Sequence, residues 1–451
     1  MRKLTVGRRD FVKSGVAAAA AIGLPTIVPS TVVGKDAPSE RVTVGLLGCG
    51  GISRYYHRNY LKRMDDVRII AVCDAYKDRR DKAVAELDGH YKSKVTKAHA
   101  DFREVLARSD VDAVIVAAHD NWHTPMSIAA AKAGKDVYCQ KPLALDLTRT
   151  SLLRKVVDEK KRVFQFGTQY RSQGRWRQLV ELVRNGYIGK LKRIDVWSRD
   201  LSFDARHYKV KPYGSDVEIP VPDGFNFDAW QGPSPMVPYT VDRTTNWGGY
   251  HCPETSLGFI AGCGIHPLGI AQWGNNSDDT SPIRYEGTGT MPTKGIYRTL
   301  ERWDVKCDYE NGVQLRFMDC RTAKGAMSKI LPRWRDGDGV YFHGTEGWIG
   351  SSWAFIASNQ KLWRQKFKSS DERLPVSPEH NRNFIDCVKS RKETICPVEM
   401  GIRCDTICHM TNVAALTGRV IKWDPKKEQI VGDAEAAKMI TRPYRKKWKV
   451  W

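Results

Sequence analysis

Continuous apolar runs alternate with amphipathic stretches along the chain after residue 40. Such runs are typical of strands buried on both faces, and we assign them to residues 41–47, 67–73, 113–118, 135–139 and 163–167. Helical patterns fill two of the intervals, at residues 125–133 and 148–160. Strands alternating with helices predict a doubly wound parallel sheet of the Rossmann type, in which ligands bind at the carboxyl ends of the strands.

The pattern changes after residue 167 and predicts a second domain of the α+β class. It begins with a helix at 174–185 and a strand at 192–198, followed by a loop-rich stretch at 203–253. Later strands are expected at 284–290, 303–309, 313–318, 339–344 and 347–351, and helices at 381–390 and 400–417. We therefore expect a Rossmann domain at 41–167 and a second domain at 168–451, with C-terminal helices that pack back on the first. The closing basic run, 442–449, is expected to be a solvated tail.

Size and composition limit the possible classes of protein. The 451 residues are too many for one ordinary domain, and a hydrophobic content of 41% is enough to bury a core. No stretch approaches the ~20 consecutive apolar residues that span a bilayer. These features exclude a membrane channel, a fibrous protein and a small disulfide-stapled scaffold.

The first 34 residues resemble a twin-arginine export signal. Arg8 and Arg9 precede Phe11 and Lys13, and a short, weakly apolar, alanine-rich run follows at 14–28. We expect residues 1–34 to be a signal peptide recognised by the twin-arginine translocase, and residues 35–40 to be a linker. The protein is then periplasmic or otherwise exported.

The net charge is strongly positive, at +22 for the whole chain. The signal carries five basic residues and one acid, which leaves +18 on the remainder. Such a surface suits an acidic sugar as substrate, or solubility alone. The basic residues are spread along the chain and form no nucleic-acid-binding module, so we expect no nucleic-acid partner.

Eleven cysteines are scattered through the expected strands and helices. Their number is odd, and free cysteine packs readily as a small apolar group, so we expect buried thiols. No Cys/His set has the spacing of a zinc site, and no metal is predicted.

A glycine-rich turn follows the first strand and reads Gly48-Cys-Gly-Gly-Ile-Ser53. The first glycine permits the tight turn, and the second allows the backbone to approach a pyrophosphate at the start of a helix. We expect Gly48, Gly50, Gly51 and Ile52 to bind a dinucleotide cofactor.

The second strand ends at Asp74, 24 residues after Gly50. A carboxylate at this place accepts a hydrogen bond from the ribose 2′-hydroxyl and repels a 2′-phosphate, which favours NAD. Lys77, Arg79 and Arg80 follow closely and leave NADP as the alternative.

Three separated phrases resemble the glucose-fructose oxidoreductase and inositol dehydrogenase family, also called Gfo/Idh/MocA. They are residues 114–123, 133–142 and 264–273, and the stretch from His380 to Tyr444 is similar to exported members. The resemblance covers residue 41 to the C-terminus, apart from an insertion at about 200–260. It implies a Rossmann domain followed by an open-faced mixed sheet, hydride transfer between a sugar or polyol and a nicotinamide, and a homo-oligomer, either a dimer or a tetramer.

The resemblance assigns a catalytic role to Lys141. The family's Glu-Lys-Pro signature reads Gln140-Lys141-Pro142 here. Lys141 would hydrogen-bond the reacting hydroxyl and stabilise the developing alkoxide. Gln140 removes a charge beside it, although its side-chain carbonyl remains an acceptor at the cofactor site.

The family's second catalytic phrase, Asp-x-Gly-x-His, places the acid/base histidine at His266 and its glycine at Gly264, but the Asp position is Gly262. Histidine suits proton transfer near neutral pH. The missing carboxylate requires another group or different chemistry. Tyr250, His251 and Glu254 lie just upstream, and we take His251 as the replacement and Tyr250 as a substrate contact.

Further binding residues are expected at two junctions. The family contacts the nicotinamide ribose from the loop after the fourth strand, which here carries Asp120, Asn121 and His123. Tyr170 and Arg171 follow the last Rossmann strand, where Arg171 would hold sugar hydroxyls or a carboxylate, or else form an ion pair. Trp230 is a candidate for stacking on a sugar ring.

Three functions fit these residues. The first is an exported sugar oxidoreductase with a tightly bound, retained NAD, working on a carbohydrate that is neutral or acidic. The second is redox-neutral glycoside cleavage, in which oxidation acidifies a neighbouring C–H, elimination follows and the hydride returns. The third is a non-catalytic sugar- or nucleotide-binding protein.

Overall fold

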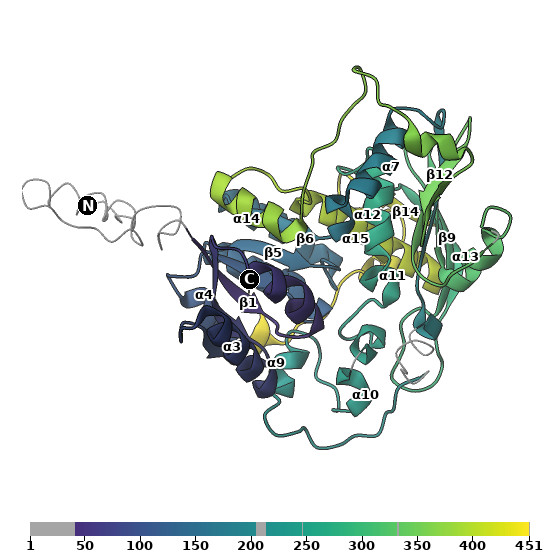
Figure 1. The fold of residues 1–451 in the computed structure, drawn as a ribbon. Helices are drawn as coiled ribbons and strands as arrows, with labels where there is room; N and C mark the ends of the chain where they lie inside the picture. The colour runs from purple at the N-terminus through teal and green to yellow at the C-terminus, as the bar shows by residue number, and fades with distance from the viewer. Residues whose placement is uncertain (1–40, 204–212, 246, 332, 451) are drawn as a thin grey trace, which may run out of the picture.

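The computed structural model describes residues 41–203, 213–245, 247–331 and 333–450. The predicted signal and linker, residues 1–40, lie outside the described residues. Two sheets dominate the molecule, a six-stranded one in the N-terminal part and a nine-stranded one in the C-terminal part (Figure 1).

The N-terminal sheet is parallel throughout, with strand order β3-β2-β1-β4-β5-β6. Its strands are β1 (Val42–Leu47), β2 (Val67–Cys73), β3 (Lys97–His99), β4 (Ala113–Val116), β5 (Asp136–Gln140) and β6 (Phe164–Gly167). The order reverses between β1 and β4, so the carboxyl ends of these strands form the crevice expected of a doubly wound sheet. The predicted Rossmann arrangement is confirmed.

Helices cover both faces of this sheet. One face packs against α2 (Asn59–Leu61), α3 (Lys77–Tyr91) and the distant α14 (His380–Ser390), through residues such as Leu61, Leu87 and Phe384. The other packs against α4 (Phe102–Ala107), α5 (Asp120–Lys132) and α6 (Thr150–Glu159). The continuous apolar strands follow from this double coverage.

Helix α5 begins at Asp120 and not near Pro125, as the sequence pattern indicated. An acid in the first turn suits the positive end of the helix, and Pro125 forgoes only one backbone hydrogen bond. Asp120, Asn121 and His123 therefore lie in the first turns of a helix, and the prediction that they lie in a loop was wrong.

The second sheet is mixed, in the order β13-β12-β11-β7-β10-β9-β8-β14-β15, with β7 and β10 parallel and the other pairs antiparallel. Its strands are β7 (Leu191–Ser198), β8 (Arg284–Thr290), β9 (Arg302–Asp308), β10 (Gln314–Asp319), β11 (Gly339–Gly344), β12 (Trp348–Ser351), β13 (Phe355–Ala357), β14 (Ile421–Asp424) and β15 (Gln429–Ile430). Three helices pack on one face: α7 (Gly174–Arg184), α12 (Ile265–Gly274) and α15 (Val398–Thr417). The predicted open-faced mixed sheet is confirmed.

Shorter helical segments complete the chain. They are η2 (Ser53–Arg58), η3 (Leu147–Arg149), η4 (Gln169–Ser172), α9 (Phe227–Gln231), α10 (Val241–Thr244), η5 (Gly248–His251), α11 (Phe259–Gly262), α13 (Cys320–Ala326), η6 (Gln360–Arg364), α16 (Ala434–Lys438) and η7 (Lys446–Trp448).

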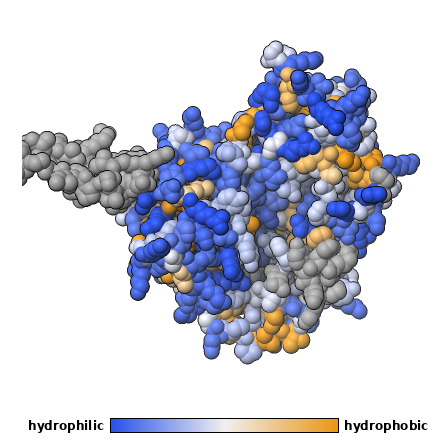
Figure 2. Space-filling view, viewed as in Figure 1, coloured by the Kyte–Doolittle hydropathy of each residue, from blue (hydrophilic) through white to orange (hydrophobic). Residues whose placement is uncertain are grey.

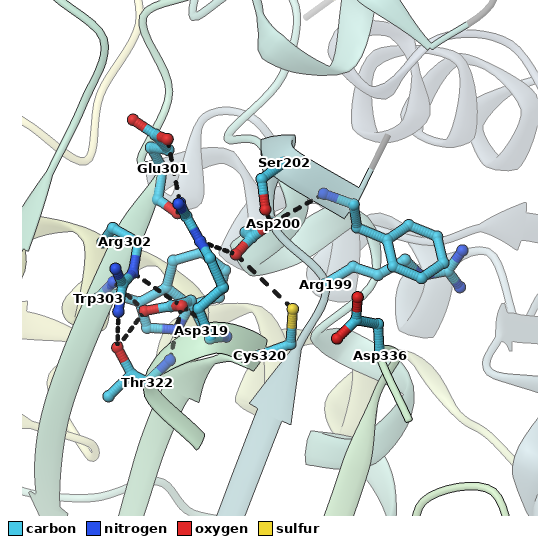
Figure 3. Close-up of polar contacts among 12 residues, drawn as sticks. Arg199, Asp200, Ser202, Glu301, Arg302, Trp303, Asp319, Cys320, Thr322 and Asp336 are labelled. Carbon is cyan, nitrogen blue, oxygen red and sulfur yellow. Dashed lines mark hydrogen bonds and ion pairs between the residues drawn. The ribbon is translucent and has the colours of Figure 1, made fainter. Parts of the chain in front are cut away.

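The insertion leaves the second sheet at the end of β7, where buried acids anchor it. Asp200 is fully buried and accepts hydrogen bonds from Arg321 at 2.8 Å and from Ser202 at 2.6 Å (Figure 3). Asp319 caps α13 and also accepts from Arg302. These acids are satisfied by arginines and backbone groups, which gives them a structural role.

The C-terminal run does not form the expected solvated tail. The Arg445 backbone amide donates to Pro233 at 2.8 Å, and the Arg445 side chain pairs with Asp228 in the insertion. Trp448 is buried and packs edge-on against Trp122 of α5, with ring centroids 5.4 Å apart. The apolar indole of Trp448 is buried, and this anchors a segment whose many charges had indicated a solvated tail.

The exterior in Figure 2 is mainly hydrophilic, with scattered hydrophobic patches. All eleven cysteines are buried free thiols. Among the described residues, no helix has both the length and the apolar character needed to cross a bilayer.

Candidate active site

A cleft of about 1300 Å³ runs along the carboxyl edge of the parallel sheet. Its floor is formed by the ends of β1, β2 and β4. Its opposite wall comes from the insertion, chiefly Trp230, Arg243 and Tyr250, and from Trp448. Ligand sites are commonly ~300–1,000 Å³, so this cleft has room for a dinucleotide and a second molecule.

The glycine-rich turn forms an open cradle at one end of the cleft. Gly48 has φ +105°, and a Cβ there would collide with the carbonyl of Ala117, so only glycine fits. A Cβ on Gly51 would meet nothing within 4 Å, so the space above the turn is open. Gly48, Gly50, Gly51 and Ile52 all line the cleft. The turn leads into the helix formed by η2 and α2, an arrangement that suits a pyrophosphate.

Asp74 lies beside this turn, at the end of β2. Its carboxylate accepts from the Cys49 amide at 2.7 Å and from the Tyr76 amide at 2.9 Å. Of the three nearby bases, Lys77 pairs with Asp81 and Arg80 donates to the Asp74 carbonyl. Arg79 lines the cleft but its guanidinium lies over the Tyr76 ring. The Asp74 carboxylate is therefore placed to bind a ribose, whereas Lys77 and Arg80 are engaged by Asp81 and by the Asp74 carbonyl.

Lys141 follows β5 and reaches across to the second domain. Its Nζ donates to the carbonyl oxygen of Gly262 at 2.5 Å and lies 5.8 Å from the centroid of the Tyr250 ring. An ammonium has three donors, so two remain for other acceptors. The lysine is thus fixed between the two domains.

The turn after Lys141 is held rigidly by buried side chains. His123 Nδ1 bonds the Pro142 carbonyl at 2.5 Å, and Thr124 donates to the Leu143 carbonyl at 2.7 Å. Asp405 and His409 of α15 bond the amide and the carbonyl of Ala144. His123, predicted as a cofactor contact, is hydrogen-bonded to the backbone next to Lys141.

Gln140 points into the protein, away from the cleft. Its amide Nε2 bonds His57 Nε2 at 2.7 Å, while His57 Nδ1 bonds the Asn381 side-chain oxygen at 2.6 Å. Burial lowers the pKa of His57 to about 3, so the imidazole is neutral and accepts from the amide. Gln140 therefore belongs to a neutral buried network.

His266 lies at the start of α12, stacked on Tyr170 with ring centroids 4.9 Å apart. Its Nδ1 is buried and has no hydrogen-bond partner among the described residues. Burial lowers its pKa well below the usual value, and the positive charges of Lys141 and Arg199 act in the same direction. The imidazole is therefore neutral at pH 7 and retains an unused ring nitrogen.

Tyr250, and not His251, faces the cleft. The His251 side chain is 1% exposed and packs against Phe259 and Tyr297, so the structure does not place this predicted catalytic residue at the cleft. A Cβ built on Gly262 would lie 3.2 Å from Tyr250 Cδ1. The tyrosine ring therefore fills the space in which a larger residue at 262 would extend its side chain.

Asn121 and Arg171, which were predicted to bind ligands, form hydrogen bonds to other parts of the protein. Asn121 donates to the Gln231 carbonyl at 2.8 Å and to Ser234 at 3.1 Å, which ties α5 to the insertion. Arg171 is buried and forms a two-pronged ion pair with Asp278 at 2.6 and 2.5 Å. Of the two roles considered for Arg171, the structure shows the ion pair.

Aromatic rings from the insertion gather at the end of the cleft. Trp230 and Tyr250 lie on either side of His119, with ring centroids 5.1 and 5.4 Å from the histidine, and Trp247 packs beside Tyr250. Burial lowers the pKa of His119 to about 4, so this group is uncharged at neutral pH. Flat, neutral rings of this kind suit the apolar face of a sugar.

Several residues that line the cleft were not predicted from the sequence, notably Arg54, Tyr55, His119, Arg243 and Trp448. Arg54 and Tyr55 directly follow the glycine-rich turn and were within reach of that motif. Arg243 and Trp448 have no such local signal, because they come from the insertion and the C-terminus.

Within the described residues, no cluster of three His, Cys, Asp or Glu side chains could hold a metal ion.

Two family models match most of the chain. The first, described as "Oxidoreductase family, NAD-binding Rossmann fold", covers residues 42–168. The second, "Oxidoreductase family, C-terminal alpha/beta domain", covers residues 175–450. Both are models of the Gfo/Idh/MocA group.

Curated relatives match part of the chain. It is 34% identical over 160 residues to the myo-inositol 2-dehydrogenase of Thermotoga maritima, covering 35% of this chain and 45% of that protein. It is 32% identical over 156 residues to glycosyl hydrolase family 109 protein 2 of Shewanella sp. (strain ANA-3), covering 30% and 34%. The matches thus span less than half the length of these relatives.

A solved structure shares the fold over a greater length. The WlbA dehydrogenase from Bordetella pertussis, in complex with NADH and UDP-GlcNAcA, has a TM-score of 0.59 and 14% identity. The match covers 85% of this chain and 98% of that one. At this identity the likeness shows the fold alone.

Proposed function

The chain belongs to the Gfo/Idh/MocA oxidoreductase family, and on this basis we propose that it oxidises a sugar or glycoside at a hydroxyl-bearing carbon, using a retained NAD. The observation that carries the proposal is the position of Lys141, which bonds the second domain at Gly262, lies beside Tyr250 of the cleft wall and acts electrostatically on His266. The open cradle at Gly51 and the carboxylate of Asp74 fit a dinucleotide.

The proposed chemistry divides between the cofactor and the chain. When bound, NAD supplies the hydride acceptor. Lys141 donates a hydrogen bond to the reacting hydroxyl and stabilises the negative charge that develops on its oxygen. His266, neutral and with an unused ring nitrogen, accepts the hydroxyl proton.

The substrate is proposed to be a carbohydrate, bound against Trp230 and Tyr250. These rings supply a flat apolar surface beside the reacting residues. Arg243 also lines the cleft and is only 6% exposed, with Glu254 as its partner at 3.0 Å. A cation in the cleft wall favours a substrate that bears a carboxylate or another acidic group.

Retention of the nucleotide is supported by a strap, which we define as residues 213–245 and 247–257 of the insertion. At the adenosine end, Phe225 stacks on Tyr76 with ring centroids 3.9 Å apart. Two backbone hydrogen bonds, Lys77 to Gly224 at 2.8 Å and Asn226 to Ala75 at 3.0 Å, fix the strap to the Rossmann domain. These contacts are proposed to slow the release of a nucleotide bound between the strap and the Rossmann domain.

Redox-neutral glycoside cleavage is the second candidate. It is favoured by Gly262, which carries no carboxylate beside Lys141, and by the similarity to a glycosyl hydrolase family 109 protein. In this reaction the substrate carbon is oxidised and the adjacent C–H loses a proton. The aglycone leaves as an alcohol, water adds to the resulting double bond, and the hydride returns to the carbon.

Export by the twin-arginine pathway and assembly as a dimer or tetramer are further parts of the proposal. Arg8→Lys together with Arg9→Lys should leave the protein in the cytoplasm, whereas wild type should be recovered in the periplasmic fraction. Sedimentation of purified protein should give a mass of two or four chains; a single chain would reject the oligomer.

The central experiment uses protein purified without added nucleotide. Denaturation should release NAD, identified by mass, in near-equal amount to protein. A panel of neutral and acidic glycosides is then added to intact protein while absorbance at ~340 nm is followed. Stable reduction establishes the oxidoreductase, and reduction that decays as aglycone appears favours cleavage. Absence of bound nucleotide and of affinity for NAD or NADP would leave only a sugar-binding protein.

A further inference from the structure

The nucleotide cleft extends past Asp74 into a part with aromatic walls. In the parallel sheet Cys73 of β2 lies opposite His99 of β3, so the residues that follow them, Asp74 and Ala100, leave the sheet side by side. Both of these residues line the cleft. The space next to them, which we call the aromatic compartment, is lined by Phe102, Trp122, Met126 and Trp448.

The rings of the aromatic compartment pack in a row. Phe102 lies edge-on to Trp122 with ring centroids 5.2 Å apart, and Trp122 lies edge-on to Trp448 at 5.4 Å. The Arg103 guanidinium lies over the Trp448 ring, 5.0 Å from its centroid. Trp448 is only 5% exposed although it comes from a basic segment. Its indole is therefore a fixed wall of the compartment.

The segment 445–450, which we call the clasp, is fixed at both ends. At its start, the Arg445 side chain forms an ion pair with Asp228 of α9, in the insertion. At its other end, the Val450 carbonyl accepts a hydrogen bond from Lys132 of α5 at 3.3 Å. The clasp therefore joins the insertion to the Rossmann domain beside the aromatic compartment, and Figure 1 shows this yellow segment next to α9.

A dinucleotide held by the glycine-rich turn and Asp74 directs its adenine toward the aromatic compartment. The turn receives the pyrophosphate, and Asp74 receives the ribose to which the adenine is attached. The base must then lie close to Asp74, and a purine stacks well on aromatic side chains. The compartment beside Asp74 supplies such side chains, whereas Lys141 follows β5, on the other side of β1 in the sheet.

We propose that Trp448 forms a wall of the adenine site and that the clasp must move away before the dinucleotide exchanges. Opening the clasp breaks the ion pair with Asp228 and separates the indole from Trp122 and Arg103, and this cost slows exchange. The inference rests on the proposed function for the presence of the dinucleotide. It adds a second device for retention, because the clasp and the strap are different segments of the chain.

The test measures the exchange of bound nucleotide. Protein that carries its nucleotide is incubated with an excess of deuterium-labelled NAD, and the nucleotide released by denaturation at timed intervals is identified by mass. In Trp448→Ala the exchange rate should rise at least about fivefold, the lower limit of what stacking of one base on an aromatic ring contributes. Lys449→Ala, at the exposed neighbouring position, should exchange as wild type does. A smaller rise in folded Trp448→Ala overturns the proposal.

A second variant keeps the test decisive if Trp448→Ala does not fold. Arg445→Ala leaves the aromatic compartment intact and removes the ion pair with Asp228 that holds the start of the clasp. Exchange in this variant should also be faster than in wild type. An unchanged exchange rate would overturn the role of the clasp.

The contact with adenine itself is tested by competition. Intact protein is equilibrated with an equal mixture of NAD and nicotinamide cytosine dinucleotide, and the two bound dinucleotides are quantified by mass. Cytosine covers less of an indole than adenine does, so wild type should retain mainly NAD, and Trp448→Ala should lower the ratio of NAD to the cytosine analogue. An equal ratio in the two proteins overturns the adenine assignment.

The outcomes separate this proposal from the proposed function. If exchange is faster in Trp448→Ala but no sugar reduces the bound nucleotide, the clasp is retained and the oxidoreductase is rejected. Reduction by a sugar together with exchange that does not depend on Trp448 gives the opposite result. Protein that neither carries nor takes up NAD overturns both.

Discussion

The ammonium of Lys141 donates a hydrogen bond to the backbone carbonyl of Gly262 at 2.5 Å, across 121 positions of the chain. The contact joins the end of a Rossmann strand to a helix of the second domain. It places the lysine between the nucleotide cleft and the aromatic group of the insertion. The lysine thus contacts a backbone carbonyl oxygen at the position where the family phrase has an aspartate.

Removal of the lysine tests its catalytic role. Lys141→Ala should lower kcat by at least ~10²–10³-fold, the range expected when one preorganised donor to a developing oxyanion is lost. The amount of nucleotide released on denaturation should stay at the wild-type level. Lys155→Ala is the control, because that lysine is exposed on α6 and pairs with the exposed Glu159. Unchanged turnover in Lys141→Ala would defeat the catalytic assignment.

Restoring a carboxylate at position 262 should fail while Tyr250 is present. A Cβ at Gly262 lies 3.2 Å from the tyrosine ring, so Gly262→Asp overpacks the site and should lower the free energy of unfolding by about 1–3 kcal/mol. Combining it with Tyr250→Ala should recover much of that loss, as measured by urea unfolding. Gly325→Asp is a control in open space. If the single variant is as stable as wild type, Tyr250 is not what fills the site.

Loosening the strap should release the nucleotide. Phe225→Ala removes the stack on Tyr76 but leaves the backbone hydrogen bonds. A stacked pair contributes ~0.5–1.5 kcal/mol beyond burial, so the dissociation rate should rise about two- to tenfold. The measurement is the nucleotide remaining after timed dialysis. Val217→Ala, at an exposed position of the strap, should behave as wild type, and equal retention in the two variants would contradict the role of the strap.

Arg171 should matter for stability and not for substrate affinity. Arg171→Met breaks its pair with Asp278 and should lower the free energy of unfolding by about 2–3 kcal/mol, below the usual cost for a buried pair because Asp278 is 38% exposed. Asp278→Asn should cause a loss in the same direction. The KM for a sugar that reduces the bound nucleotide should not change. A raised KM with unchanged stability would restore the substrate contact.

Stability should be greatest near pH 6.5. His57, His119, His380 and His409 are buried, and their folded pKa values of about 3 or 4 lie below the ordinary 6.5. The unfolded state binds more protons over that interval, so stability falls as pH drops from 6.5 toward 4. Asp405 acts oppositely, because burial raises its folded pKa to about 8, and its contribution is lost as pH rises toward that value.

The alkaline side of this profile can be assigned by substitution. Between pH 6.5 and 8 the free energy of unfolding should fall by up to about 1.4 kcal/mol per pH unit through Asp405. In Asp405→Asn the slope over this interval should disappear, whatever offset the buried amide introduces. Thermal unfolding at closely spaced pH values measures both curves. A slope that persists in the variant would place the titrating group elsewhere.

Local patterns were sufficient to predict most strands of the two sheets, but not the short strands β3, β13, β14 and β15. They also predicted that the glycine-rich turn and Asp74 lie together, and both line the cleft. The glycine-rich turn and Asp74 lie in consecutive strand–helix units, and each needs only the spacing along the chain. The sequence pattern predicts a helix from residue 125, whereas α5 begins at Asp120 and includes Pro125. Because of this difference, Asp120, Asn121 and His123 were predicted to lie in a loop, and their buried hydrogen bonds were not expected.

The sequence by itself determined the family, the parallel sheet and, through the family resemblance, the mixed sheet and the positions of Lys141 and His266 in the family's phrases. Periodicity, turn chemistry and motif phrases are all read over short stretches. Only the tertiary structure decided that Tyr250 and not His251 meets the cleft, that Arg171 is bound by Asp278, and that Gln140 faces His57. Adjacent side chains on a tight turn point in different directions, and partners 83 to 121 positions apart meet only when the domains pack, so no local pattern contains these choices.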